Sequence, residues 1–521
     1  MYLQTLDYAI VIIYALFLLF IAQWVSREKV GHQKDTSDYF LAGRNLPWWA
    51  IGASLIAANI SAEQIIGMSG SAWVMGIAIG AYEWMAALTL IIVGKYLLPV
   101  FLKHQIYTMP QFLEQRYDHR VRMVMAFFWL GVYVFVNLTS ILWLGAQAVT
   151  TVTGLDLTWA LVALGVFATA YSLYGGLKAV AMTDIIQVTL LVLGGLLIAG
   201  IALNEVSGGE GMIAGFGVLL ERAPEKFDLI FTKDSPHYQY LPGISVLIGG
   251  MWIMNLSYWG FNQYIIQRAL AAKSVTEAQK GIMFAAYLKM LIPVIVVLPG
   301  VAAVMLAPDL SAPDKAYPTV MRLLPTGLLG LVFAALIAAI VSSLASMMNS
   351  ISTIFTMDFY RHHMNKEGSE QHLVKIGRTV SLTAMVIAMI VARPLLGNFD
   401  QAFQYIQEFT GFFTPGVCAL FLMGIFWKRT TANGALGIAI GSAVFSLIFK
   451  FAWPELPFID RVGWVFVLCI ATGMVISMVQ GAEEHPDAID FKDVNTATTS
   501  GFNWAALGVV LMLAALYVTW W

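Results

Sequence analysis

Three polar side chains stand out because they interrupt long apolar stretches: Glu83, Lys289 and Gln407. A charged group at the centre of a lipid bilayer costs at least about 2.5–3.5 kcal/mol, so such residues rarely occur there without a function. Charged and amide groups of this kind bind polar solutes through hydrogen bonds. The three residues therefore indicate a site for a polar solute inside a membrane protein. A mutual structural ion pair between Glu83 and Lys289 is the alternative.

A second set of polar side chains recurs at helical spacing: Ser342, Ser346, Asn349 and Thr353. Small and hydroxylated stripes commonly pack membrane helices together. A hard cation such as sodium, in contrast, needs several oxygen ligands, which the same side chains could provide. The spacing alone favours helix packing and leaves both interpretations open.

The composition is that of a membrane protein. Of the 521 residues, 59% are hydrophobic and 12% are charged, and the mean hydropathy is +0.76; an ordinary soluble domain has about 25% charged residues. We therefore expect the chain to lie in a lipid bilayer. A net charge of −2 leaves no basic stripe for nucleic acid, and no obligate protein partner is evident. Cys418 and Cys469 lie in apolar stretches and are interpreted as packing residues.

Fourteen apolar windows are long enough to cross about 30 Å of hydrocarbon. They lie near residues 7–25, 47–72, 77–100, 121–150, 156–175, 180–204, 244–264, 276–306, 327–357, 374–396, 401–427, 431–452, 462–481 and 502–521. The first is interpreted as an anchor and not as a signal peptide, because no basic residue precedes it. The sequence therefore predicts an all-α polytopic membrane protein with 14 transmembrane helices.

The positions of lysine and arginine predict the orientation of the windows. Basic residues gather in alternate connections: Arg27, Lys29, Lys34 and Arg44; Lys95, Lys103, Arg116, Arg120 and Arg122; Arg268, Lys273 and Lys280; Arg361, Lys366, Lys375 and Arg378; Lys428 and Arg429. The connections 73–76 and 151–155 carry none. We expect these basic connections inside and both termini outside, with the long segment 205–243 on the outer face.

Windows two to eleven divide into two blocks of five, over residues 47–204 and 244–427. Five crossings invert the second block relative to the first, as in transporters built on inverted repeats. The first helix of each block, 47–72 and 244–264, has polar residues and glycines near its centre, so both are expected to be broken there. Residues 1–46 and 428–521 would add peripheral helices to this single transmembrane domain, 1–521.

Six motifs carry a family resemblance: GASLIAANISAEQIIGMSGS (52–71), YEWM (82–85), YSLYGGLKAV (171–180), YWGFNQYIIQRALAAKS (258–274), AAIVSSLASMMNS (338–350) and QAFQYIQE (401–408). In order and spacing the chain resembles the sodium/sugar cotransporters of the sodium-solute symporter family. The resemblance implies a leucine-transporter-type inverted-repeat fold with two discontinuous helices. It also implies sodium as the coupling ion and the plasma membrane, here a bacterial inner membrane, as the location.

A sodium site at the first break is part of that implication. Where a membrane helix unwinds, its carbonyl groups can bind sodium without adding a charge. The implied ligands are the carbonyls of Ala57, Ile60 and Ala339 and the hydroxyls of Ser342 and Ser343. Asp184 corresponds to a carboxylate on the sodium exit path, and a solvated position at the membrane interface is its alternative.

A sugar presents hydroxyl groups and apolar C–H faces, so its site needs polar groups and an aromatic platform. The resemblance implies a hydroxyl-binding ring of Gln64, Glu83, Asn255, Lys289 and Gln407, in which Glu83 and Asn255 meet the hydroxyl that separates galactose from glucose. It implies an inner gate at Tyr258 and an outer gate of Met68, Tyr82 and Phe403, for which ordinary packing is the alternative. Supports that hold the breaks open would be Asn59, Glu63, Trp259, Asn262 and Gln263.

The function that this resemblance implies is sodium-coupled sugar symport by alternating access, with galactose first and glucose second as the solute. Inositol, sialic acid and proline are the alternatives within the family. Ala86 departs from the family pattern, in which a serine would contact the sugar near C2.

An enzyme is not expected and no catalytic residue is assigned, because no phosphate loop or clustered Asp motif is evident. A sensor would need an attached signalling domain and is not expected either.

Overall fold

A computed structural model describes residues 3–25, 36–173, 176–397, 402–481, 483–485 and 488–521. These residues form helices and connections, with one isolated parallel bridge between Leu46 and Ala272. Among them, ten helical runs are long and apolar enough to cross a membrane. The chain is therefore an all-helical, multi-pass membrane protein. The count of fourteen crossings stays a prediction, and three of the basic residues used for the orientation, Arg27, Lys29 and Lys34, lie outside the described residues.

The first part of the chain contains α1 (Thr5–Val25), α2 (Thr36–Leu41), η1 (Ala42–Arg44), α3 (Trp48–Asn59), η2 (Glu63–Met68), α4 (Ser69–Met75), η3 (Gly76–Gly80), α5 (Ala81–Ile92), η4 (Val93–Leu97), α6 (Leu98–Lys103), α7 (Met109–Arg116), α8 (His119–Val132), η5 (Tyr133–Leu138), α9 (Thr139–Thr153), α10 (Leu157–Ser172), α11 (Gly176–Val206), α12 (Met212–Arg222) and η6 (Pro224–Lys226). The second part contains α13 (Ser245–Ile248), α14 (Gly250–Phe261), α15 (Gln263–Leu270), α16 (Val275–Ile295), α17 (Val297–Leu306), η7 (Pro313–Lys315), α18 (Ala316–Met321), α19 (Leu328–Ile354), η8 (Phe355–Met364), α20 (Glu370–Leu396), α21 (Ala402–Thr410), α22 (Thr414–Phe426), α23 (Ala432–Ala452), α24 (Phe458–Val479), η9 (Phe491–Asp493) and α25 (Ser500–Thr519).

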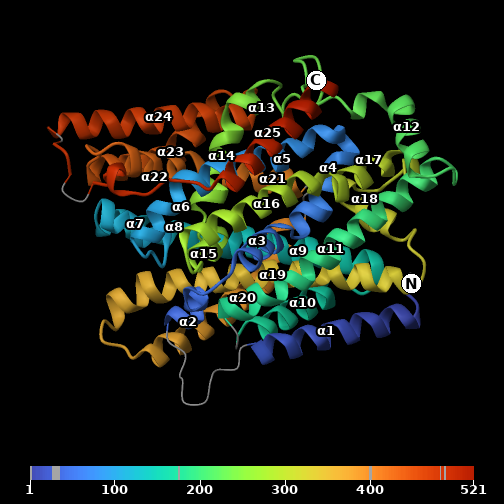
Figure 1. Ribbon diagram of the computed structural model, residues 1–521, viewed down its shortest axis with the longest axis horizontal. Helices are drawn as coiled ribbons and strands as arrows, with labels where there is room; N and C mark the ends of the chain where they lie inside the picture. Colours follow the sequence, from blue (N-terminus) through green and yellow to red (C-terminus); the bar gives the residue numbers. More distant parts are fainter. Residues whose placement is uncertain (1–2, 26–35, 174–175, 398–401, 482, 486–487) are drawn as a thin grey trace.

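The centre of the molecule is built on α3 and α19. In Figure 1 the long helices lie side by side, with α24 along one edge and α1 along the opposite edge. Every residue from 50 to 59 of α3 is buried, and α19 is buried along nearly its whole length. A helix that is apolar on all sides suits burial by other helices or by lipid, and the small buried residues of α3 indicate the former. α3 accordingly packs against α11, α15, α16 and α19.

The helix that starts with α3 is broken at Ile60, as the sequence predicts. Ile60 has φ −73° and ψ 78°, and the N–H of Ser61 donates to the carbonyl of Asn59 at 2.7 Å. This geometry is an inverse γ-turn. The helix resumes as the wider π-helical turn η2. Because α3 ends here, the carbonyls of its last turn lose their regular partners within the helix.

The sequence predicts the second break near the centre of the window 244–264, and this is wrong: α14 runs unbroken from Gly250 to Phe261. The break lies at Asn262, between α14 and α15, at the end of that window. Its backbone is extended, with φ −86° and ψ 119°. The hydroxyl of Tyr133 donates to the side-chain oxygen of Asn262 and accepts the N–H of Gln263 at 2.9 Å. The side-chain amide of Gln263 accepts from the backbone N–H of Met109 at 2.7 Å and donates to the backbone carbonyl of Tyr107 at 3.1 Å. Side chains from the neighbouring helices therefore satisfy the backbone at this break.

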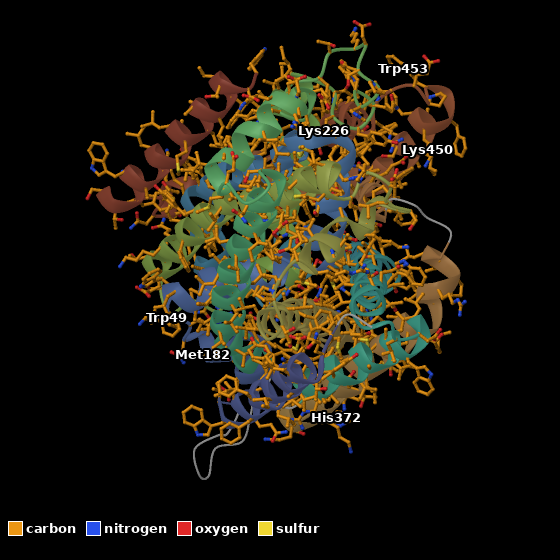
Figure 2. All side chains as sticks on the ribbon, turned by 90° about the vertical axis from the view of Figure 1, so that its right-hand side faces the viewer. Trp49, Met182, Lys226, His372, Lys450 and Trp453 are labelled. Carbon is orange, nitrogen blue, oxygen red and sulfur yellow. The ribbon has the colours of Figure 1, made fainter. Side chains whose placement is uncertain are left out.

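The segment 205–243 covers the end of α4. The ammonium group of Lys226, labelled in Figure 2, donates to the carbonyls of Trp73 and Val74 at 3.2 and 2.7 Å. The negative end of the helix dipole stabilises a cation at this position. Gly76 follows with φ +78°, and a Cβ there would lie 2.1 Å from the carbonyl oxygen of Lys226, so only glycine fits.

The peripheral helix α1 is attached to the core through a buried carboxylate. One oxygen of Asp7 accepts the N–H groups of Gly327 and Gly330 at 2.7 and 2.9 Å, and the other accepts the N–H of Gln4 at 2.9 Å. Gly327 and Gly330 lie at the start of α19, where backbone N–H groups have no partner within the helix. Asp7 is fully buried. It therefore caps the central helix from a different helix.

We predict that Asp7→Ala lowers the free energy of unfolding by about 1–3 kcal/mol, because buried N–H groups lose their acceptor. Asp156→Ala is the matched control, since Asp156 caps α10 through a single exposed contact with the N–H of Thr158 at 2.9 Å. Thermal unfolding of the detergent-solubilised variants measures the difference. An equal loss in the two variants would show that the Asp7 contacts do not attach α1 to α19.

Candidate functional site

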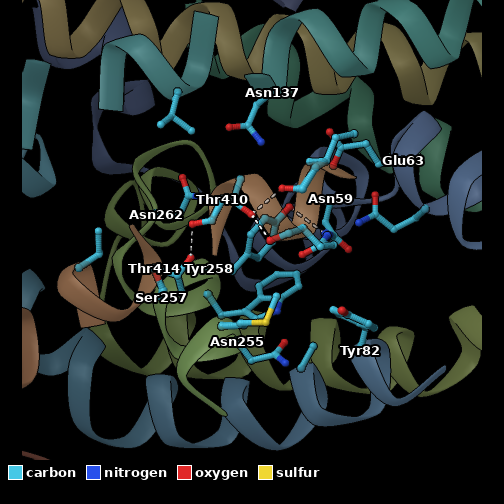
Figure 3. A pocket seen from close by; sticks show the side chains of 18 of the residues that line it. Asn59, Glu63, Tyr82, Asn137, Asn255, Ser257, Tyr258, Asn262, Thr410 and Thr414 are labelled. Carbon is cyan, nitrogen blue, oxygen red and sulfur yellow. Dashed lines mark hydrogen bonds between the residues drawn. The ribbon is translucent and has the colours of Figure 1, made fainter. Parts of the chain in front are cut away.

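The two breaks border one interior cavity of about 110 Å³, shown in Figure 3. Residues from α3, η2, α5, α14, α16 and α21 line it. All the predicted ring and gate residues lie in its wall: Gln64, Glu83, Asn255, Lys289 and Gln407; Met68, Tyr82, Tyr258 and Phe403. Of the predicted supports, Asn59, Glu63, Trp259 and Asn262 also line it, whereas Gln263 lies behind the second break. The individual roles of these residues stay predictions.

A buried ion pair lies in the wall of this cavity. The Lys289 ammonium donates to the carboxylate of Glu83 and to the side-chain oxygen of Asn59, and it lies 4.9 Å from the ring centroid of Trp259. The Lys289 and Glu83 side chains are 1% and 4% exposed. The mutual ion pair that the sequence left open therefore forms in this structure. Because the pair also faces the cavity, a solute with hydroxyl groups could exchange hydrogen bonds with both charges.

Hydrogen bonds from the cavity wall stabilise both breaks. The amide of Asn59 donates to the Tyr258 hydroxyl at 2.8 Å, and the hydroxyls of Tyr258 and Tyr264 are bonded to each other. These contacts link the first break, at Asn59, to the helices α14 and α15 on either side of the second. The chain of hydrogen bonds connects the two broken helices directly.

Two further polar residues of η2 are held by hydroxyl groups. The Ser140 hydroxyl donates to the Glu63 carboxylate at 2.6 Å, and the Ser61 hydroxyl donates to the Gln64 side-chain oxygen at 3.0 Å. Both side chains are buried. Gln64 lines the cavity, where its amide nitrogen could donate to a solute.

The two ends of the cavity differ in exposure. Met68, Tyr82 and Phe403 are buried, and the rings of Tyr82 and Phe403 meet edge to face with centroids 5.4 Å apart. Tyr258 and Asn262, at the other end, are partly exposed. The cavity is therefore closed at the predicted outer gate and reached past the predicted inner gate.

A second polar cluster lies where α3 meets α19. The Ser343 hydroxyl lies 3.2 and 2.9 Å from the carbonyl oxygens of Ala57 and Ala58, which belong to the last turn of α3. A hard cation such as sodium is expected to bind oxygen ligands at about 2.3–2.6 Å. Two oxygen ligands at right angles around it would then lie about 3.4 Å apart. The Ser343 and Ala57 oxygens already have nearly this separation. Ile60 lies at the break, and Ala339 lies one turn before Ser343, buried in α19.

Asp184 connects the same region to a buried arginine. Its carboxylate accepts from the hydroxyls of Ser342 and of Ser54, the latter at 2.5 Å. Arg268 donates to the Ser54 hydroxyl at 3.0 Å. Asp184 is fully buried, so it is not the solvated interfacial residue that its sequence position also allowed. Arg268, which the sequence placed among the inner basic residues, is fully buried as well. The Ser342 hydroxyl therefore faces Asp184, while Ser343 faces the break.

Several polar residues of the cavity were not predicted from the sequence: Asn137, Ser257, Thr410 and Thr414. Phe403, Gln407 and Thr410 are separated by four and three residues, which places them on one face of α21, and Thr414 follows four residues later at the start of α22. This stripe could have identified the two threonines. Asn137 is one of two amides in the apolar window 121–150, with Gln147, and no periodic signal marks its direction.

Comparisons with known proteins agree with this architecture. Residues 39–441 match the family model described as Sodium:solute symporter family. The chain is 48% identical to the sodium/glucose cotransporter of Vibrio parahaemolyticus, with 100% of this chain and 99% of that protein covered. It is 35% identical to the mouse (Mus musculus) sodium/myo-inositol cotransporter 2, with 86% and 71% covered. A sodium-coupled sialic acid symporter, solved in a substrate-bound outward-open state, matches with a TM-score of 0.80 and 24% identity over 91% of this chain and 98% of that one.

The broken helices and the fold likeness define a leucine-transporter-type fold. The family and the curated relatives are sodium-coupled transporters and not enzymes. The match over most of the chain identifies the family. The protein belongs to the sodium:solute symporter family.

We predict that Lys289→Met destabilises the protein by about 3–5 kcal/mol, because it leaves the Glu83 carboxylate buried without its cation. The double variant with Glu83→Gln should regain much of this loss. Lys450→Met is the control, since Lys450 pairs with Glu408 at 3.0 Å in a half-exposed position where an ion pair contributes at most about 1 kcal/mol. Similar melting temperatures for the two lysine variants would contradict the assignment of a strong buried pair.

Proposed function

We propose that this protein is a sodium-coupled sugar symporter, with galactose as its first substrate. The observation that supports this most is the cavity where amides and an aromatic ring from both broken helices meet the charged pair of α5 and α16. The charges and amides match the hydroxyl groups of a sugar, and Tyr258 offers an aromatic face for its C–H groups. The sugar transport named for the Vibrio relative is consistent with this proposal.

The preference for galactose rests on Glu83 and Asn255. We assign this pair to the hydroxyl whose orientation separates galactose from glucose, and Gln64, Lys289 and Gln407 to the other hydroxyls. Glucose, named for the Vibrio relative, is the second substrate, and inositol, named for the mouse relative, is the third. Sialic acid and proline remain solutes that an assay must include.

Coupling follows from the position of the first break. Sodium bound by Ala57, Ile60, Ala339, Ser342 and Ser343 would hold the α3 carbonyls against α19. Asn59 and Gln64, on the cavity side of the same break, would then be fixed for the sugar. Sugar and ion would thus bind better together than apart, and Asp184 would receive sodium on its way inward.

The energetics allow one sodium ion for each sugar. One charge moving through 100 mV supplies about 2.3 kcal/mol, and a tenfold sodium gradient adds about 1.4 kcal/mol. Together they could maintain a sugar gradient of a few hundredfold, so no further ion is required.

For the topology we propose fourteen crossings in the plasma membrane, with both termini outside and inverted repeats over 47–204 and 244–427. Peripheral helices occupy 1–46 and 428–521. With this orientation Tyr258 lies on the inner side and Met68, Tyr82 and Phe403 on the outer side. The cavity described above then corresponds to an inward-facing arrangement, in which the outer gate is closed.

Sodium-dependent uptake in proteoliposomes tests the proposed function. A panel of galactose, glucose, inositol, sialic acid and proline should give uptake of galactose first and glucose second, driven by an inward sodium gradient. Uptake of galactose that is unchanged when potassium replaces sodium would contradict the proposal, as would a preference for sialic acid or proline.

For the ion site, we predict that Ser343→Ala greatly weakens sodium-driven accumulation, because a ligand oxygen at the first break is lost. Ser352→Ala is the matched control: Ser352 lies on the same helix, and its hydroxyl donates to the Gly377 carbonyl at 2.8 Å, away from the break. Accumulation is measured as a function of sodium concentration, and expression and melting temperature check folding. Wild-type sodium dependence in Ser343→Ala would place the ion elsewhere.

For the sugar site, we predict that 2-deoxygalactose competes almost as well as galactose. Ala86 lines the cavity one turn after Glu83 and has no hydroxyl to offer near C2. Ala86→Ser should restore discrimination by about 0.5–1.5 kcal/mol, the net contribution of a typical hydrogen bond. Competition against galactose uptake in both proteins gives the answer. Strong rejection of 2-deoxygalactose by the wild type, unchanged in Ala86→Ser, would mean that Lys289 or water already holds the C2 hydroxyl.

A further inference from the structure

Three of the eight histidines of the chain meet far from the cavity. His119 begins α8, and His362 and His363 lie in the last turn of η8. One ring nitrogen of each histidine lies within 4.8 Å of the corresponding nitrogens of the other two. The rings of His119 and His362 are stacked with centroids 4.3 Å apart. Within the described part of the chain, no other three His, Cys, Asp or Glu residues bring possible ligand atoms this close. The cluster joins segments separated by more than 200 residues.

We propose that His119, His362 and His363 form a binding site for a divalent transition-metal ion of the zinc class. Imidazole nitrogens suit Zn²⁺, Ni²⁺ and Cu²⁺, whereas Mg²⁺ and Ca²⁺ take oxygen ligands. Zinc binds histidine nitrogens at about 2.0–2.1 Å in a tetrahedron, so its ligand atoms lie about 3.4 Å apart. Closing the cluster to this spacing needs shifts of about 1 Å, which partly exposed side chains can make by rotation about χ1 and χ2.

The neighbouring carboxylate supports one of these ligands. Glu114 lies 3.3 Å from Nδ1 of His119, which leaves Nε2 free for a metal. Histidines that bind metals typically donate their other ring N–H to a carboxylate or carbonyl group, which fixes the tautomer and orients the ring. The three side chains reach solvent, since His119 and His362 are partly buried and His363 is exposed. An ion therefore has an open path to them.

The charges beside the cluster permit a cation. Arg122 pairs with Glu114 and, at 2.6 Å, with the buried Asp358. These three side chains carry one positive and two negative charges, so one negative charge is in excess. Arg120 is paired with Asp118 at 2.7 Å. The remaining close neighbour is the thioether of Met123, 3.2 Å from Nε2 of His363. This sulfur is a weak ligand that does not oppose a metal.

The consequence is a metal-dependent link between α8 and η8. The Arg122–Asp358 pair already joins these two elements one turn further toward the core. A metal held by His119 on one side and His362 and His363 on the other would add a second link at the open end. Binding to the folded state alone would raise the melting temperature.

Titration calorimetry of the full-length protein in detergent with ZnCl₂ tests the proposal. We expect one saturable site per chain and no binding of MgCl₂. His119→Ala and His362→Ala should each weaken Zn²⁺ binding at least about tenfold, as expected when one of three ligands is lost. His362→Cys should keep the site, because a thiolate also binds zinc. His372→Ala is the control: His372, labelled in Figure 2, contacts the Tyr360 hydroxyl at 2.8 Å and is not in the cluster.

The same variants give a second measurement through zinc-dependent thermal stabilisation. The wild type and His372→Ala should be stabilised by Zn²⁺, and His362→Ala should not. The proposal is overturned if the wild type shows no saturable zinc binding, or if His119→Ala and His362→Ala bind zinc as tightly as the wild type. Metal-free melting temperatures of all variants establish that the alanine variants are folded.

Discussion

A backbone carbonyl inside a membrane must accept a hydrogen bond from within the protein. The carbonyls in the last turn of α3 have lost the N–H donors that a continuous helix would provide. The turn at Ile60 ends the helix in the centre of the molecule, where water is excluded. The carbonyls of Ala57 and Ala58 then accept from Ser343 of α19. One serine hydroxyl thus replaces hydrogen bonds that a continuous helix would have made. A cation is the other partner that such carbonyls can accept, and this gives the break its proposed function.

The break also positions the cavity. Asn59 is the last residue of α3, and its side chain contacts both the Lys289 ammonium and the Tyr258 hydroxyl. A shift of the last turn of α3 would therefore move the Asn59 side chain, and with it the hydrogen bonds to the buried ion pair and to the predicted inner gate. The two proposed ligand sites share this turn, which is a direct physical route for coupling between them.

Much of this arrangement was predictable from the sequence. Among the described residues, the ten long apolar helical runs overlap predicted windows. Glycines with clustered polar residues located the break at Ile60, whereas the break at Asn262 lies at the end of its window and not near its centre. The contacts of the polar groups were not predictable, because they depend on how helices far apart in the chain pack together. Asp7 stands at the first residue of the first window, where nothing in the sequence indicates a partner, yet it caps α19. Arg268 looked like an inner-face charge, yet it is buried against Ser54. Positive-inside counting cannot distinguish a paired, buried arginine from a solvated one.

The most direct test of coupling at the first break is equilibrium binding of galactose to the purified protein, with sodium and with potassium in its place. We predict that sodium raises the affinity for galactose by at least about fivefold, and that galactose raises the affinity for sodium by the same factor, as thermodynamic linkage requires. Equal affinities for galactose in sodium and in potassium would show that the two ligands are not coupled at this break.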